Sequence, residues 1–151
     1  MGDVMKEKKV GFMLRKIVTE QFATIESVLN EKENVQLSVG INFGISEENK
    51  ILGCITHFGF ITNDKPFILI QVKCEFEIDA HSWSGFINPD LNRISFPKGF
   101  LSHLAVITVG TVRGVLHAKT ENTPFNQYFL PTINVSEFLK EDFSFDLVTK
   151  E

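Results

Sequence analysis

Hydrophobic and polar residues alternate without a fault along residues 35–46, where apolar side chains take the odd positions and polar residues or glycine take the even ones. This period of two is typical of a strand with one face on the core of an antiparallel sheet. Similar β-type runs cover residues 51–61 and 67–78, separated by polar turns at 47–50 and 62–66. Residues 10–27 are also β-like but lose their alternation near 19–22, which indicates a long strand with a bulge or a kink there. The pattern therefore predicts four antiparallel strands.

The register of the hairpin formed by residues 51–61 and 67–78 follows from its apolar face. If Ile61 faces Phe67, then Cys54 faces Cys74, and one face of the hairpin is apolar almost throughout. A slip of one residue would mix the two faces, so the pattern supports this register. It places Phe67 and Leu69 on the opposite, mixed face.

Residues 97–119 predict a long helix, because Pro97 suits a first turn and apolar residues recur at helical spacing. The β-branched run at 105–112 is compatible with a strand as well. The helix is apolar nearly all round, so one sheet cannot cover it and a second copy of the chain is the simplest cover. His103 and Arg113 interrupt its apolar character, and we expect it to be too short to span a membrane. The expected oligomer interface comprises Phe100, Leu104, Ile107, Gly110, Thr111 and Gly114.

Two long connections flank this helix. Residues 79–95 show no clear period and residues 120–133 contain two prolines, and both carry several aromatic residues. Asn134 followed by Glu137 predicts an N-cap that starts a short helix to about residue 141, with Phe138 and Leu139 inward. The tail from residue 143 has no assignment.

Composition narrows the function classes. The chain has 151 residues and a net charge of −4, so it lacks the basic field that draws nucleic acid or an anionic membrane. Residues 1–9 are charged and lack the apolar stretch of a signal peptide, which predicts a cytoplasmic protein. No phosphate-binding loop, nucleophile motif or metal-ligand spacing occurs, so we expect a single domain over 1–151 with no enzymatic activity and no cofactor or metal. The fifteen phenylalanines fill the core or line a surface for apolar partners.

Three motifs stand in a recognisable order: Phe96-Pro97 opens the long helix, Gly110-Thr111 follows within it, and Leu130-Pro131-Thr132-Ile133-Asn134 precedes Phe138. With the first strand, FMLRKIVTEQ, they make the chain similar to the SecB family of bacterial export chaperones, including the relatives associated with toxin–antitoxin systems. The resemblance implies an α+β protomer with a four-stranded antiparallel sheet followed by a long and a short helix. It also implies a homotetramer, a dimer of dimers in which two eight-stranded sheets sandwich the long helices.

The function that the resemblance implies is that of an ATP-independent holdase for unfolded or aggregation-prone polypeptides. The client-binding residues expected on this basis and from their apolar character are Trp83, Phe86, Phe125, Tyr128, Phe129, Leu130, Phe138, Phe67 and Leu69.

The chain departs from the family in the region where its members bind a SecA-type motor. Glu20 and Glu26 are the acidic residues available for motor docking, but Gln71 stands where an acidic residue is expected. Service in export, service to an antitoxin, and a dedicated interaction with one folded partner therefore all stay open. A small-molecule binding protein is the remaining alternative, and it requires a closed pocket with convergent polar groups.

Overall fold

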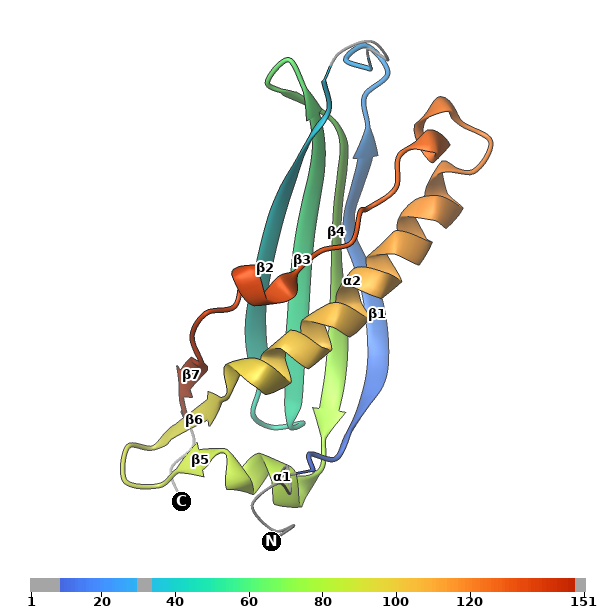
Figure 1. The fold of residues 1–151 in the computed structure, drawn as a ribbon. Helices are drawn as coiled ribbons and strands as arrows, with labels where there is room; N and C mark the ends of the chain where they lie inside the picture. The colour runs from blue at the N-terminus through green and yellow to red at the C-terminus, as the bar shows by residue number, and fades with distance from the viewer. Residues whose placement is uncertain (1–8, 30–33, 149–151) are drawn as a thin grey trace, which may run out of the picture.

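A computed structural model describes residues 9–29 and 34–148 of the chain. The prediction that the chain starts without a signal peptide rests mostly on residues 1–8, which lie outside the described residues. Figure 1 shows a curved sheet with one long helix running diagonally across it, and a second, small sheet at one end. In chain order the elements are β1 (Phe12–Thr24), β2 (Gln36–Ser46), β3 (Ile51–Thr62), β4 (Lys65–Ile78), α1 (Ala80–Gly85), β5 (Ile87–Asn88), β6 (Arg93–Phe96), α2 (Lys98–Thr120), the 3-10 turns η2 (Pro124–Gln127) and η3 (Val135–Glu137), and β7 (Phe143–Asp146).

The large sheet has the strand order β1-β4-β3-β2, with every neighbouring pair antiparallel. The predicted register between β3 and β4 is confirmed over most of its length, since Cys54 pairs with Cys74 and Phe58 with Ile70. Even-numbered residues of β3 and β4 form the inner face of the sheet, which packs under α2 and is buried almost throughout. The apolar face read from the sequence is therefore the core face of the protein.

The turn between β3 and β4 is tighter than expected. Asn63 and Asp64 both have positive φ, 52° and 64°, and they form a two-residue loop of the type that asparagine and aspartate favour. The register shifts by one residue after Phe60, so Ile61 pairs with Pro66 and not with Phe67. Phe67 is the extra residue, and its side chain is fully buried. The prediction that Phe67 lies on the outer face is wrong because this bulge turns it into the core.

β1 is irregular in two places. Its register against β4 shifts between Thr19 and Gln21, as the broken alternation predicts, and again between Leu14 and Lys16. The two shifts leave β1 as a long strand at one edge of the sheet.

The connection from residue 79 to 95 is not an irregular loop. It contains the short helix α1, whose N-cap Asp79 accepts a hydrogen bond from the backbone N–H of Ser82 at 2.7 Å. It then contributes β5 and β6 to a three-stranded sheet completed by β7. Elements this short show no period in the sequence, and β6 finds its partner β7 about fifty residues further along the chain.

The long helix is confirmed, with Pro97 at its N-cap. Two threonines of the helix are buried: Thr108 donates to the carbonyl of Leu104 at 2.9 Å and Thr120 to that of Leu116 at 2.8 Å. Each buried hydroxyl therefore has a hydrogen-bond partner within the helix.

The fold class predicted from the sequence, a four-stranded antiparallel sheet with a long helix and a short one, is confirmed, but the short α-helix is α1. The helix expected from residue 134 to 141 is a single 3-10 turn. Asn134 caps it as predicted, accepting from Ser136 N at 3.3 Å. The chain then turns away because Asp142 accepts from the backbone N–H of Lys98 at 2.9 Å and β7 pairs with β6. As a result Leu139 is buried, whereas Phe138 points outward.

Candidate functional site

α2 buries one face on the sheet, mainly over β3 and β4. The buried residues follow helical spacing and come from both of the apolar stripes seen in the sequence. Leu104 belongs to this set with no exposed surface, so its expected place in an oligomer interface is wrong: it faces the core of its own protomer. The buried residues are Leu101, Leu104, Ala105, Thr108, Val109, Val112, Leu116 and Thr120.

The opposite side of α2, which we call the outer face, carries Ile107, Gly110, Thr111 and Gly114. Both glycines are exposed, and a β-carbon built on either would meet no atom within 4 Å. Ile107 and Thr111 are half-buried.

By length and composition α2 is long and apolar enough to cross a membrane, so the expectation that it is too short for a span is wrong on that measure. The core helix of a globular protein passes the same test, and α2 does bury one face against its own sheet. Length and composition alone therefore decide nothing about a membrane.

β1 leaves apolar side chains uncovered beside α2. Leu14 pairs with Phe76 and Ile17 with Cys74, so both lie on the inner face of the sheet. They are nevertheless 40% and 48% exposed, because α2 packs mainly over β3 and β4 and meets β1 at Phe12 and Phe22, on either side of these two residues. Within the protomer, β1 pairs on one side only.

Where β1 begins, the space between it and the first turns of α2 is a groove of about 660 Å³, which we call the aromatic groove. The rings of Phe12 and Phe86 each lie 5.6 Å from that of Phe100, and Phe12 lies 5.7 Å from His103. Grooves of this size accept several large apolar side chains. The lining residues are Val10, Phe12, Phe86, Pro97, Gly99, Phe100 and His103.

On its other side α2 is flanked by residues 128–134, an extended segment that belongs to neither sheet and runs between η2 and η3 (Figure 1). The guanidinium of Arg113 donates to the carbonyls of Leu130 and Pro131, at 3.1 and 2.8 Å. A hollow of about 240 Å³ remains between the segment and α2, lined by Val106 and Ile133 among others. Val106 is 55% exposed at its rim.

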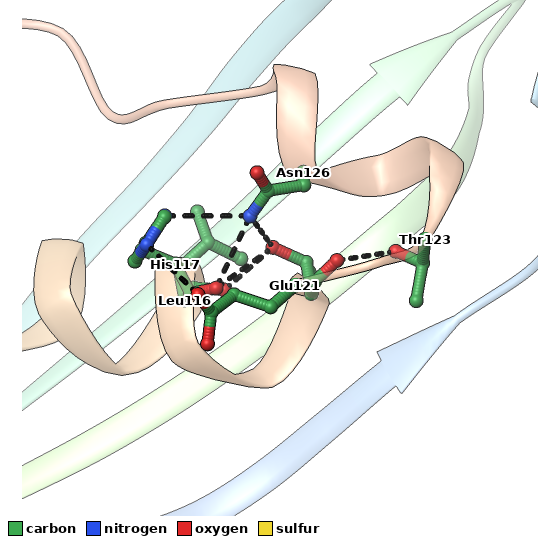
Figure 2. A network of polar contacts seen from close by, with 6 residues as sticks. Leu116, His117, Glu121, Thr123 and Asn126 are labelled. Carbon is green, nitrogen blue, oxygen red and sulfur yellow. Dashed lines mark hydrogen bonds and ion pairs between the residues drawn. The ribbon is translucent and has the colours of Figure 1, made fainter.

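A polar network closes the C-terminal end of α2 (Figure 2). The amide Nδ2 of Asn126 donates to the carbonyl of His117 at 3.1 Å and to the hydroxyl of Thr120 at 3.0 Å, and lies 3.3 Å from His117 Nδ1. Glu121 Oε2 lies 3.6 Å from His117 Nε2 on the far side of the ring. The network attaches η2 to the helix and so fixes where residues 128–134 begin.

The expected client-binding residues divide into three groups. Phe129 and Phe138 are 56% and 45% exposed and are available to a partner. Phe86, Tyr128 and Leu69 are half-buried. The remaining four are buried in this conformation and offer no surface to a partner, because they anchor the loops on the core: Phe67, Trp83, Phe125 and Leu130.

Sequence reasoning missed the apolar residues of β1. Val10, Phe12, Leu14 and Ile17 line or adjoin the aromatic groove and the uncovered sheet edge. Their apolar character was visible in the sequence, but which of them α2 covers depends on the position of the helix.

The expected motor-docking residues lie on the outer side of the sheet and in the turn after β1. Glu20 accepts a hydrogen bond from Gln71 at 2.9 Å and lies 3.6 Å from the ammonium of Lys73. Glu26 is exposed. Lys73 also lies 3.2 Å from Glu75, so two carboxylates share one ammonium and this part of the outer side keeps a net negative charge.

The polar chemistry of the described residues is sparse. Cys54 and Cys74 are free, buried and opposite each other, and burial raises the pKa of the Cys54 thiol to about 12. A thiol held neutral in this way is a poor nucleophile. Across residues 9–29 and 34–148, no three histidine, cysteine or acidic side chains gather into a group that could hold a metal ion.

Comparisons with known proteins assign no family. No family model matches the chain, and no curated protein matches it. Among solved structures, a protein of unknown function from Streptococcus agalactiae aligns with 83% of this chain and 99% of its own, at 12% identity and a TM-score of 0.40. A likeness this distant supports no conclusion about activity.

Proposed function

We propose that this protein is an ATP-independent holdase that binds extended, apolar segments of unfolded polypeptides. The observation that carries the proposal is the apolar surface left open along both sides of α2. The aromatic groove lies on one side, and Val106 and Phe129 on the other. Each client side chain buried there contributes about 1.5–3 kcal/mol. Several such contacts hold a chain without reading its sequence.

The proposal includes assembly into a homotetramer. The outer face of α2, with open space around Gly110 and Gly114, suits close packing against the same face of a second copy. The free edge of β1 suits antiparallel pairing with another β1, which would join two sheets into one of eight strands. Both contacts bury surface that a single protomer leaves to solvent.

The second candidate is a chaperone dedicated to one partner, such as an antitoxin. It is favoured by Gln71, which stands on the outer side of β4 where a motor-docking surface is expected to be acidic, and donates a hydrogen bond to Glu20. For both candidates we propose a cytoplasmic, non-enzymatic protein that binds polypeptide, with no nucleic acid, membrane insertion or cofactor involved. Recovery of one stoichiometric partner from cells would favour the dedicated chaperone.

The holdase is tested by light scattering while urea-denatured luciferase is diluted into buffer. We expect the protein to suppress aggregation when tetramer and client are equimolar. The double substitution Phe129→Ser with Phe138→Ser removes two exposed rings and is expected to weaken suppression at least several-fold, with little change in stability because neither ring is in the core.

Leu91→Ser is the matched control, since Leu91 is 64% exposed but lies in the turn between β5 and β6. It is expected to leave suppression unchanged. Failure of the wild-type protein to suppress aggregation at a several-fold excess would refute the holdase.

A further inference from the structure

Residues 128–134, which we call the strap, already resemble the kind of ligand that a holdase binds. The strap is extended, and its sequence, YFLPTIN, is mostly apolar. Over residues 128–131 its side chains alternate as those of an extended peptide on a surface do: Leu130 is buried and its neighbours Phe129 and Pro131 are exposed. The alternation ends at Thr132, which is exposed.

The strap covers apolar surface that belongs to the sheet and the helix. The ring of Tyr128 lies 5.0 Å from that of Phe67 and 6.0 Å from that of Phe60. Further along, Leu130 and Ile133 face α2 across the hollow of about 240 Å³. This hollow opens to solvent beside Val106, which is 55% exposed, so apolar surface between the strap and α2 is accessible while the strap is in place.

Polar clasps rather than sheet pairing hold the strap. One clasp is the fork of Arg113 on the carbonyls of Leu130 and Pro131. The other is the Asn126 network at the end of α2, shown in Figure 2. Arg113 is half-buried, and His117 and Glu121 in the second clasp are exposed, so water can replace these hydrogen bonds when the strap lifts.

We infer that the strap is an internal stand-in for client, which shields part of the polypeptide-binding surface and is displaced when an unfolded chain binds. The inference rests on the proposed holdase function and assigns to it a built-in gate. Displacement exposes Phe60, Phe67 and the adjoining side of α2 to the incoming chain. The strap thereby lowers the affinity of the client-free protein for unfolded polypeptides. It also keeps the apolar surface beneath it from contacting the same surface of another molecule.

The first test is limited proteolysis of the full-length protein with the substitution Arg113→Gln. Losing the hydrogen bonds of Arg113 to the strap carbonyls is expected to raise the rate of chymotryptic cleavage within the strap about tenfold, with the large sheet uncut. Arg93→Gln is the matched control, since it removes the ion pair of Arg93 with Asp146, 2.9 Å long, in the small sheet. An unchanged cleavage rate in Arg113→Gln would overturn the inference that Arg113 holds a movable segment.

The second test locks the strap. Val106→Cys and Ile133→Cys place thiols on opposite walls of the hollow, and a short bis-maleimide joins them while the native cysteines stay buried. The probe is fluorescent, reduced and carboxymethylated lactalbumin, a permanently unfolded chain. The cross-linked protein is expected to bind it at least tenfold more weakly than the same variant before cross-linking, and Arg113→Gln to bind it more tightly than wild type.

The outcomes separate the gate from the function itself. If the wild type binds the probe and the cross-link leaves that affinity unchanged, the gate is refuted and the holdase stands. If the wild type binds the probe and the cross-link weakens binding at least tenfold, the gate is supported together with the holdase. If the wild type does not bind the probe, the holdase fails and the gate fails with it.

Discussion

Replacing Gly110 and Gly114 together by alanine tests whether the outer face of α2 is exposed to solvent or packed against a second copy. The substitution should stabilise a protein whose outer face is exposed, and it should weaken an assembly in which that face is packed. The structure leaves open space around both positions, with no atom within 4 Å of either added β-carbon. In an isolated protomer each substitution should therefore gain the full difference in helix propensity, about 1 kcal/mol. Together they stabilise the protomer by about 2 kcal/mol, which raises its Tm by about 4–8 °C for a domain of this size.

In an assembly that packs α2 against α2, the same methyl groups enter a close contact. Overpacking a contact costs about 1–3 kcal/mol per site, and a two-fold interface contains each site twice. The dissociation constant should then rise by at least about tenfold. Sedimentation velocity over a range of concentrations measures the mass, and urea unfolding at the lowest concentration measures the stability of the protomer.

Gly44→Ala is the control for this experiment, because Gly44 also has nothing within 4 Å of an added β-carbon but lies in β2, away from α2. It is expected to leave the mass unchanged. A double alanine variant with greater stability and wild-type mass would refute the packing of the outer face. A wild-type protein that stays monomeric at high concentration would refute the assembly as a whole.

Three further predictions concern the protomer. Leu104→Ala should destabilise it by about 2–5 kcal/mol, because Leu104 is fully buried; Ile107→Ala, measured alongside by urea unfolding, should cost clearly less, and equal losses would contradict the assignment of Leu104 to the core. Burial raises the pKa of Cys54 to about 12 from 9.0, so this thiol should resist a disulfide reagent at pH 8 until the protein unfolds. The free energy of unfolding should also fall as the pH rises from 9 towards 12, because the Cys54 thiol then ionises only in the unfolded chain. The backbone N–H of Ser82 lowers the pKa of Asp79, so the ionised cap stabilises the fold at neutral pH and this contribution disappears as the pH falls through the lowered pKa. The stability difference between wild type and Asp79→Asn should therefore shrink between about pH 5 and pH 3, and a difference that does not change with pH would count against the cap.

The alternation of apolar and polar residues predicted the strands and the register of the large sheet well. The alternation in residues 35–46 and the apolar face shared by β3 and β4 give the observed register, because one buried face penalises any slip. The prediction was wrong at the turn between β3 and β4. Asn63 and Asp64 adopt positive φ and shorten the loop, and this moves Phe67 from the outer face to the core. The small sheet escaped prediction because β6 and β7 are four residues each and pair across a long separation.

The sites were predicted less well than the elements. Aromatic residues in the two connections were all candidates for a surface, yet Trp83 and Phe125 serve as anchors for those connections while Phe129 remains exposed. Nothing in the sequence distinguishes an anchor from a contact residue when both are aromatic and close to a proline or a turn. Leu14 and Ile17 differ in the opposite way: they lie on the inner face of the sheet as core residues do, but they are left partly exposed.

The sequence by itself determined which residues form strands and helix, and which faces of them are apolar, because periodicity and cross-strand pairing act between near neighbours. The tertiary structure alone decided how far that apolar surface is covered. α2 crosses the sheet diagonally, packs mainly over β3 and β4 and leaves Leu14 and Ile17 of β1 partly uncovered, while the strap occupies its other side. Coverage depends on the placement of whole elements relative to one another, and that placement is set by the sum of many distant contacts that no local pattern records.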